Sequence, residues 1–241
     1  MRHNHVTLLS LVMFAFVLET KATPSTQIWI PSTDVQAFLK PHIGWDIYMN
    51  TFGNGLISNG GVTMGVIPSG ILGLELGLDY RDGSGVHGNP ILFNAKLGLA
   101  ENTFSNFMPA IAIGGYDYGV KDNVSNYNVT YGLISKNIWK LGRFSFGGYK
   151  GLGPDELWLS SSGKVRDAGV LLSWDRVINE LTDKLWLAVD FQSGNNSYGA
   201  LSFGVGWSFA SNVGVIIGYD IYNDSDISEP TFTMQFDINF F

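Results

Sequence analysis

Charged side chains recur at alternate positions within segments that are otherwise apolar or small. Acids outnumber bases in this set, which comprises Asp46, Glu75, Asp79, Asp117, Asp190, Asp220 and Asp237 with Arg81, Lys96, Lys136 and Arg143. Charges gathered on one enclosed face either line water or pair with one another, because burying an unpaired ion is costly. The excess of carboxylates predicts that a water-filled path along this face prefers cations. Ion pairs that fill and rigidify a narrow interior are the alternative, and the sequence leaves both open.

Residues that catalyse hydrolysis or bind transition metals are scarce. The chain has 4 histidines and no cysteine. His42 lies at the start of an apolar segment and His87 in a glycine-rich loop, and neither is placed beside a serine and an acid as an activated nucleophile requires. No histidine-rich spacing suits a transition metal. We therefore expect no catalytic site, no metal and no cofactor.

The elements that position the charged set are predicted to be β-strands, because apolar residues alternate with small or polar ones over most of the chain. In "VGVIIGYDIY", Val213, Val215 and Ile217 lie on one face, whereas Gly214 and Asp220 lie on the other. Helical periodicity is nowhere sustained. The pattern predicts twelve strands, near residues 37–52, 60–67, 71–81, 90–100, 108–120, 127–138, 143–151, 168–179, 183–193, 198–210, 213–223 and 231–241.

The connections between these segments alternate in length. Those after even-numbered strands are mostly tight, such as 68–70 and 210–212, whereas those after odd-numbered strands are longer or more polar, such as 151–167. Tight turns on one rim and long loops on the other are typical of outer-membrane barrels, in which the short turns face the periplasm. The sequence therefore predicts an all-β, transmembrane, antiparallel up-and-down barrel.

The composition of the two strand faces distinguishes a membrane barrel from a soluble one. A soluble barrel packs bulky apolar side chains inside and presents many charges to water. Here the less apolar face is small, with Ala200, Ser202 and Gly204 in one strand, whereas the oily face is long and aromatic towards its ends. We therefore predict that the oily face meets lipid. The residues assigned to it include Phe203, Val205, Trp207 and Phe209 in one strand and Tyr127, Val129, Tyr131 and Leu133 in another.

The C-terminal stretch "TFTMQFDINFF" carries a family resemblance. Its apolar side chains alternate towards the end of the chain, and its last part contains Phe236, Ile238, Phe240 and Phe241. Phe241 itself falls on the opposite face from the alternating set. The stretch resembles the last strand of bacterial outer-membrane β-barrel proteins, which commonly ends in an aromatic residue and is recognised by the barrel assembly machinery. The resemblance implies a bacterial outer-membrane location and contact with its lipid, and we expect a monomer.

The N-terminal residues 1–22 are predicted to form a cleaved signal peptide, because a short apolar run follows Arg2 and ends in "ETKA". That run is too short for a helix that crosses a bilayer, which needs about 20 residues. The whole chain has a formal net charge of −7, and removal of the peptide leaves it acidic. We therefore expect no nucleic-acid partner, since that affinity depends on clustered lysine and arginine.

Two further segments bear on access to the barrel. Residues 23–36 precede the barrel domain, residues 37–241, and either plug the lumen from the periplasmic side or add a short strand. The loop 151–167 carries Trp158 and either folds over the mouth or remains a surface loop. For neither segment does the sequence decide between the two alternatives.

Together these features predict a passive channel for small hydrophilic solutes or ions. The first alternative is a largely closed barrel whose long outer loops bind a ligand or a surface partner, and tightly paired interior charges without conductance favour it. The second is an outer-membrane hydrolase, which the strand count alone supports, because twelve-stranded outer-membrane barrels include enzymes as well as channels.

Overall fold

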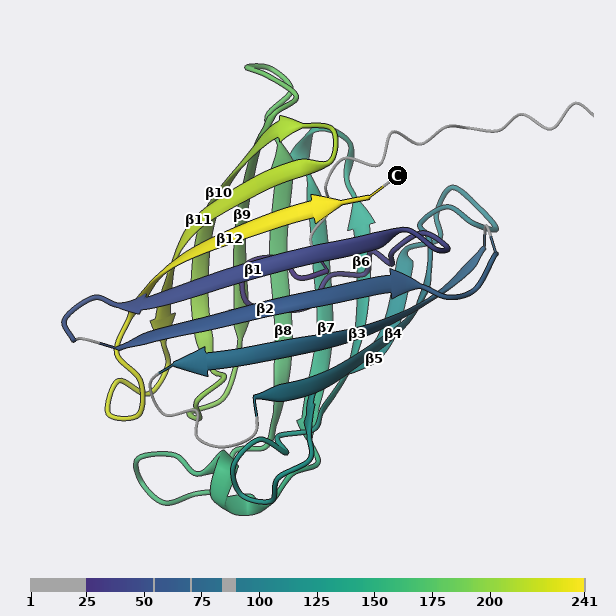
Figure 1. The fold of residues 1–241 in the computed structure, drawn as a ribbon. Coiled ribbons are helices and arrows are strands. Elements are labelled where there is room, and N and C mark those ends of the chain that lie inside the picture. The colour runs from purple at the N-terminus through teal and green to yellow at the C-terminus, as the bar shows by residue number, and fades with distance from the viewer. Residues whose placement is uncertain (1–24, 54, 70, 84–89, 241) are drawn as a thin grey trace, which may run out of the picture.

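The computed structural model describes residues 25–53, 55–69, 71–83 and 90–240. Over these residues the chain forms a closed antiparallel barrel, in which sequence neighbours pair and the last strand pairs with the first (Figure 1). The strands are β1 (Pro41–Asn50), β2 (Leu56–Gly65), β3 (Leu72–Gly83), β4 (Ile91–Leu99), β5 (Ala110–Gly119), β6 (Val129–Asn137), β7 (Arg143–Gly151), β8 (Ala168–Val177), β9 (Leu185–Gln192), β10 (Ala200–Ala210), β11 (Val213–Tyr222) and β12 (Thr231–Asn239). The signal peptide expected at 1–22, His87 and Phe241 lie outside the described residues.

The fold class and the number of strands predicted from the alternation are confirmed. Two strands differ by four residues at their starts: β1 begins at Pro41 rather than near residue 37, and β2 begins at Leu56 rather than near residue 60. The polar start of β2 contains Asn59, Gly60 and Gly61, which are residue types typical of turns. Pairing with β1 on one side and β3 on the other nevertheless holds this run extended. Tertiary pairing here overrides the local preference.

The two rims of the barrel differ. One carries the start of β1 and mostly short connections, such as 211–212 between β10 and β11 and the 3-10 helix η1 (Trp139–Leu141) between β6 and β7. The other carries the longer connections, and the one between β7 and β8 contains the 3-10 helix η2 (Asp155–Trp158). Below, these are the short-turn rim and the long-loop rim. Within the described residues, no helix has the length and apolar character needed to cross a membrane.

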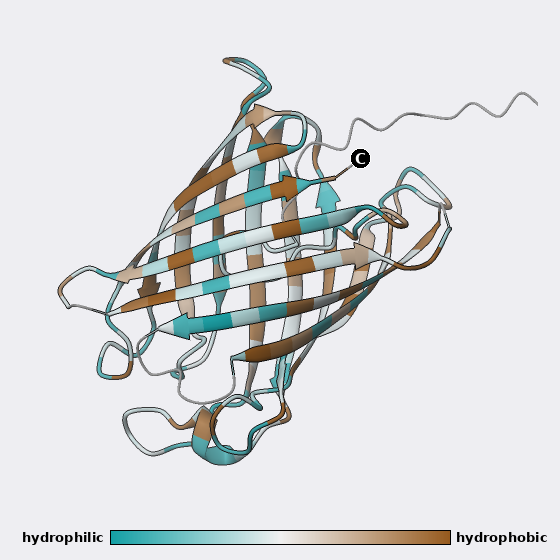
Figure 2. Cartoon of the chain, in the orientation of Figure 1, coloured by the Kyte–Doolittle hydropathy of each residue, from teal (hydrophilic) through white to brown (hydrophobic). Residues whose placement is uncertain are grey.

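An apolar belt surrounds the barrel. Hydrophobic positions alternate with polar or small ones along the strands (Figure 2), and the outward ones are exposed, as Val205 (50%) and Ile217 (57%) are. Ser202 and Thr233 face inward and are buried. Such a surface is stable against lipid rather than water, and closure of the barrel leaves no unpaired strand edge in hydrocarbon. The predicted outward direction of the oily face is confirmed for these strands.

Strand β6 departs from that prediction. Val129, Tyr131 and Leu133, which the alternation assigned to lipid, are buried in a cluster inside the barrel. Ile134 is instead the exposed, outward side chain. The prediction for this strand is wrong because its more apolar face packs against the aromatic cluster inside the barrel, a tertiary contact that the alternation does not report. The inward set is stabilised by packing against Ile30, which precedes the barrel in sequence.

A bulge in β5 turns two consecutive side chains into the lumen. The register between β4 and β5 shifts at this point, so that Tyr116 and Asp117 both lie opposite Asn94. Asp117 has φ +54°, a left-handed conformation that aspartate tolerates better than most residues. Its backbone N–H donates to Asn94 Oδ1 at 3.2 Å. The bulge therefore re-aims a carboxylate that strict alternation places on the other face from Tyr116.

Replacing Val205 with arginine is expected to lower the free energy of unfolding by about 2–4 kcal/mol, because this residue lies on the lipid side in the middle of β10. Leu181→Arg is the matched control. Leu181 is 77% exposed in the turn between β8 and β9, where the same change costs about 0–1 kcal/mol. Urea titrations of both variants in lipid vesicles measure the difference, and equal costs would contradict a lipid-facing belt.

Candidate functional site

Residues 25–36, here called the inner segment, fold back into the barrel and occupy part of its lumen (Figure 1). A tight hairpin forms its deepest part, with an antiparallel bridge between Thr26 and Pro31. Ile28 and Ile30 within this hairpin are 1% and 0% exposed. Of the two alternatives for the N-terminal extension, the structure thus places residues 25–36 inside the ring of strands rather than as a further strand of the barrel wall.

One carboxylate on the barrel wall holds the hairpin tip. Asp190 Oδ2 accepts hydrogen bonds from the backbone N–H groups of Ile28 at 2.8 Å, Trp29 at 2.9 Å and Ile30 at 3.3 Å. Successive amides that converge on one oxygen form an anion-binding concavity, here filled by the protein's own side chain. Gln235 Nε2 on β12, three strands from Asp190 on β9, donates to the Ile28 carbonyl at 2.7 Å.

Glycines on the wall make room for the inner segment. A Cβ at Gly204 would lie 2.8 Å from Ile28 Cδ1, and one at Gly98 would lie 2.4 Å from Val35 Cγ2. Both distances are shorter than real contacts of a Cβ, so a side chain at either position displaces the segment. The small inward residues of these strands therefore serve close packing, as glycine does where another backbone approaches.

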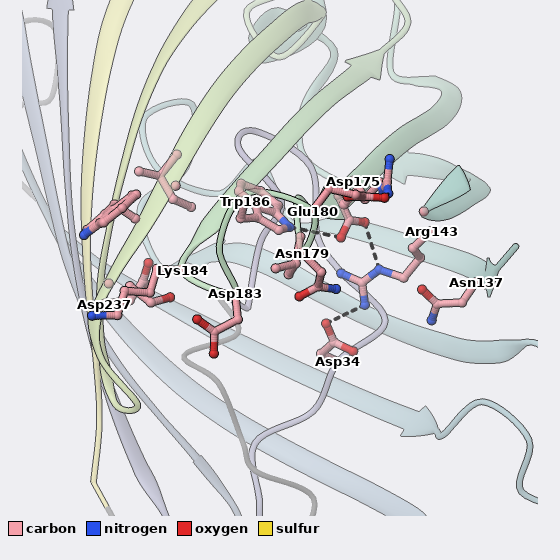
Figure 3. A pocket seen from close by; sticks show the side chains of 18 of the residues that line it. Asp34, Asn137, Arg143, Asp175, Asn179, Glu180, Asp183, Lys184, Trp186 and Asp237 are labelled. Atoms are coloured by element: carbon pink, nitrogen blue, oxygen red, sulfur yellow. Dashed lines mark hydrogen bonds and ion pairs between the residues drawn. The ribbon is translucent and has the colours of Figure 1, made fainter. Parts of the chain in front are cut away.

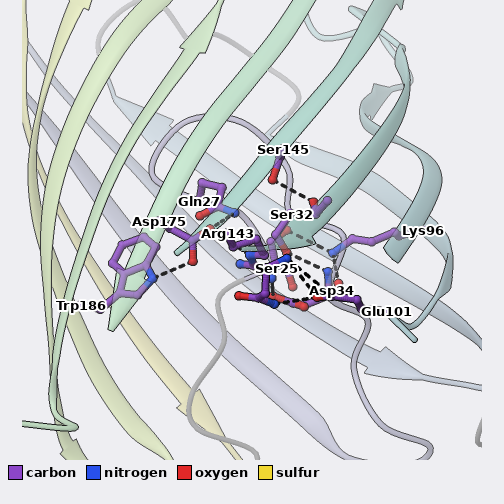
Figure 4. A network of polar contacts seen from close by, with 12 residues as sticks. Ser25, Gln27, Ser32, Asp34, Lys96, Glu101, Arg143, Ser145, Asp175 and Trp186 are labelled. Atoms are coloured by element: carbon purple, nitrogen blue, oxygen red, sulfur yellow. Dashed lines mark hydrogen bonds and ion pairs between the residues drawn. The ribbon is translucent and has the colours of Figure 1, made fainter. Parts of the chain in front are cut away.

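Ion pairs fix the returning arm of the inner segment (Figure 4). Arg143 Nη1 lies 2.6 Å from Asp34 Oδ2, and Arg143 Nε lies 2.8 Å from Asp175 Oδ1. Lys96 Nζ donates to the Asp34 carbonyl at 2.6 Å and lies 3.6 Å from Glu75 Oε1. Charges from β3, β4, β7 and β8 thus converge on a few residues of the segment, and their mutual pairing limits the cost of burial.

Aromatic side chains fill the long-loop end of the lumen beside β6 to β8. Trp158 from the β7–β8 connection is fully buried, and its ring stacks on Tyr198 with centroids 5.3 Å apart. Tyr127 and Tyr149 contact the same indole at 5.6 and 6.2 Å. Within the loop 151–167, Trp158 and Ser160 are buried at the mouth, whereas residues 161–166 are exposed. Tyr127, which the sequence assigned to lipid, instead faces this cluster.

Two cavities remain beside the inner segment. The first, here called the long-loop cavity, has a volume of about 560 Å³, follows β1 to β5 and extends to Ser125 and Ser228 in the long loops. The second, called the short-turn cavity, has a volume of about 680 Å³ and opens near the short turns, with Arg143 and Asp175 in its wall (Figure 3). Asp237 lines both cavities. Asp237 therefore borders both spaces, beside the inner segment.

Most of the charged set predicted from the sequence lies inside the barrel. The members that line the long-loop cavity are Asp46, Glu75, Asp79, Arg81, Lys96, Asp117 and Asp237. Arg143 lines the short-turn cavity. Asp190 and Asp220 face inward and are buried, but neither lines a cavity, because Asp190 binds the inner segment and Asp220 accepts a hydrogen bond from Thr231 at 2.9 Å. Phe236, Ile238 and Phe240 of the C-terminal pattern are exposed on the lipid side.

Lys136 does not line the lumen, contrary to its predicted place. It lies on the outward parity at the end of β6, and its Nζ is 2.8 Å from Glu101 Oε1 in the β4–β5 connection. Its position follows from the inward packing of Tyr131 and Leu133, which reverses the parity of the whole strand. Burial acts to raise the pKa of Glu101, but hydrogen bonds from Lys136 and Asn137 outweigh it and hold this pKa below its usual value.

Three ion pairs neutralise part of the charge along the long-loop cavity. The Arg81 guanidinium binds Asp117 through two hydrogen bonds of 2.9 and 2.8 Å. Tyr198 O–H donates to the same carboxylate, and burial together with the Asp117 charge raises the pKa of Tyr198. His42 Nε2 lies 3.3 Å from Oδ1 of Asp237, the residue that lines both cavities. The third pair is that of Lys96 with Glu75.

Sequence reasoning missed several residues of this interior. Asp175 pairs with Arg143 and Gln27, and its alternation with Ser173 in "AGVLLSWDRV" carried the signal that places it inward. Asp34 and Tyr198 lie outside the strands, where no periodicity indicates a direction. Their contacts depend on partners far away in the sequence.

The described residues do not bring together the parts of a hydrolytic site. His42 contacts Asn239 at 3.1 Å and Asp237 at 3.3 Å, and neither side chain is a nucleophile paired with a base. In the same part of the chain, no group of three histidine, cysteine, aspartate or glutamate side chains is placed to hold a metal ion. The arrangement offers instead an acidic, partly blocked passage.

Comparisons with known proteins identify the fold. No protein-family model and no curated protein matches the sequence. Among solved structures, an outer membrane channel from Pseudomonas putida F1 is similar, with a TM-score of 0.54 and 12% identity over 86% of this chain and 97% of that chain. The NanC porin (TM-score 0.46, 10% identity, 84% and 99% covered) and the Acinetobacter baumannii outer membrane protein Omp33 (0.42, 12%, 84% and 97%) are more distant. None of the three is named as an enzyme. The chain thus has the fold of an outer membrane channel, and a closed barrel with a lipid-facing belt belongs in the bacterial outer membrane.

Proposed function

We propose that the protein is a passive outer-membrane channel through which small hydrophilic cations pass between the inner segment and the β1–β5 wall. The observation that carries this proposal is that one residue, Asp237, lines both cavities. One cavity reaches the long loops and the other the short turns, and in the proposed path the solute passes from one to the other beside Asp237. The His42–Asp237 pair, at 3.3 Å, lies on this path.

The charge of the passage supports a preference for cations. Five carboxylates line the long-loop cavity, from Asp46, Glu75, Asp79, Asp117 and Asp237, against the permanent cations of Arg81 and Lys96. Carboxylates that line a narrow, low-dielectric path raise the local concentration of cations and repel anions. No motor or coupling element is needed for such passage, because the solute moves down its own gradient.

A largely closed barrel that binds a ligand through its long loops is the second candidate. The observation that favours it is the filling of the lumen, since the inner segment and Trp158 block the side of β6 to β9. In this case the long-loop cavity is a binding pocket with one entrance. Conductance distinguishes the two candidates, because a pocket with one entrance carries no current.

Single-channel recording under a salt gradient tests the proposal. The refolded protein in a planar bilayer is expected to give discrete current steps, with a reversal potential of the sign that cation preference produces. Asp237→Asn is expected to move that potential towards zero, because it removes a carboxylate that lines both cavities. A silent bilayer from folded protein would reject the channel, and an anion-selective potential would reject the role of the acids.

A further inference from the structure

The long-loop cavity has the size of a small-molecule site. Its volume of about 560 Å³ falls within the range of about 300–1,000 Å³ that ligand pockets occupy. Trp29 of the inner segment forms one side, and the inward faces of β1 to β5 form the other. A cavity of this size can hold a small organic solute as well as ions.

Two of its carboxylates have no cationic partner among the described residues. Glu75, Asp117 and Asp237 each pair with a base, but neither Asp46 nor Asp79 lies within ion-pair distance of one. The charge of Arg81 acts on both, but its guanidinium is bound by Asp117. Asp79 accepts a hydrogen bond from Asn94 Nδ2 at 2.7 Å. An amide donor neutralises no charge, so this part of the wall keeps an excess of negative charge.

The backbone brings these two carboxylates towards each other. Asp79 on β3 lies opposite Gly61 on β2, and β2 separates it from Asp46 on β1. A Cβ at Gly61 would lie 2.2 Å from Asp79 Oδ1. Glycine at this position therefore lets the Asp79 carboxylate lean over β2 in the direction of β1. Any larger residue would displace it.

Aromatic and hydroxyl groups complete the wall. Tyr48 follows Asp46 by two residues on the same face of β1, and its ring meets Trp29 edge to face with centroids 5.5 Å apart. Thr63 on β2 is 8% exposed, lines the cavity, and its Oγ1 has no hydrogen-bond partner within the described residues. Aromatic rings attract organic cations, and a buried hydroxyl without a partner is an available acceptor for an N–H donor.

We infer that the long-loop cavity binds a small organic cation, with a primary ammonium group between Asp46 and Asp79 and its apolar body against Tyr48 and Trp29. The ammonium supplies donors to both carboxylates. The inference rests on the proposed function, because the passage is what loads the cavity from solvent. It adds the class of solute that the passage retains.

Isothermal titration of the folded full chain in detergent micelles tests the inference without requiring current. The probe is benzylammonium, and benzyl alcohol and potassium chloride are titrated in parallel, with heats from protein-free micelles subtracted. Benzylammonium is expected to bind in the millimolar range or tighter, whereas the neutral alcohol and potassium are expected to bind at least tenfold more weakly. Similar affinities for all three probes, or no heat with benzylammonium, would overturn the inference.

Variants locate the site. Asp46→Asn with Asp79→Asn is expected to weaken benzylammonium binding at least tenfold, whereas Asp155→Asn with Glu156→Gln removes two exposed loop charges and leaves it unchanged. Equal loss in both pairs would overturn the inference. If the variant with Asp46→Asn and Asp79→Asn does not fold, the comparison of the three probes on the unaltered chain still tests the inference. Binding by a chain that carries no current rejects the channel alone, and current without binding rejects the organic-cation site alone.

Discussion

Asp190→Ala is expected to raise the time-averaged conductance of the barrel about tenfold or more. The carboxylate accepts three backbone hydrogen bonds from the tip of the inner segment, the shortest at 2.8 Å. A hydrogen bond to a charged group contributes about 1.5–3 kcal/mol, and about 1.4 kcal/mol changes an equilibrium tenfold. Loss of even one such contribution therefore shifts the segment substantially towards a displaced state. Single-channel recording of the variant measures the change.

Asp220→Ala is the matched control for this prediction. Asp220 is 0% exposed and faces the lumen from β11, as Asp190 does from β9, but its hydrogen bond goes to Thr231 on the barrel wall. Equal increases in the two variants would show that general loosening of the wall, rather than release of the inner segment, admits the current.

A disulfide distinguishes displacement of the segment from other effects of the Asp190 change. A Cβ at Gly73 would lie 3.1 Å from Val35 Cβ, a few tenths of an ångström below the disulfide range of about 3.5–4.5 Å. The chain has no cysteine of its own. In the Asp190→Ala background, oxidation of a Val35→Cys, Gly73→Cys pair is expected to restore low conductance, and a reductant is expected to release it. Persistent high current in the oxidised protein would contradict gating by the segment.

The alternation in the sequence sufficed to predict the strands but not every face. In β11, glycines and Asp220 alternate with Val213, Val215 and Ile217, so one face is clearly apolar and the direction follows. In β6 the more apolar face, with Val129, Tyr131 and Leu133, points inward because it packs against the cluster around Trp158 and Ile30. Alternation thus separates the two faces of a strand, but which face meets lipid also depends on what fills the lumen beside it.

The contacts inside the barrel were harder to predict from the sequence than the strands were. The inner segment has no two-residue or helical period, and its partners Asp190 and Gln235 lie 162 and 207 residues from Ile28. The bulge at Asp117 likewise depends on a register shift against β4 that no local pattern announces. The charged set was therefore largely predictable as a set, whereas its division into ion pairs, segment contacts and unpaired carboxylates was not.

Arg81→Gln is expected to lower the free energy of unfolding by about 3 kcal/mol. Asp117 is 2% exposed, and the guanidinium supplies both of its cationic hydrogen bonds, at 2.9 and 2.8 Å. Breaking a buried pair costs about 3–5 kcal/mol, since the remaining charge is left uncompensated. The lower end applies because the Arg81 side chain retains 26% exposure to the lumen. Urea unfolding in lipid vesicles measures the loss.

Two further variants test this cause. Adding Asp117→Asn to Arg81→Gln is expected to recover most of the loss, because asparagine carries no charge and its oxygen still accepts the Tyr198 hydroxyl. Arg176→Gln, which breaks a pair with the 55% exposed Glu180, is expected to cost less than about 1 kcal/mol. If the double variant were no more stable than Arg81→Gln, the guanidinium would act through packing rather than charge. Arg81→Gln also makes the long-loop cavity more acidic, so its cation preference should rise even as the barrel weakens, a combination that simple loss of structure does not produce.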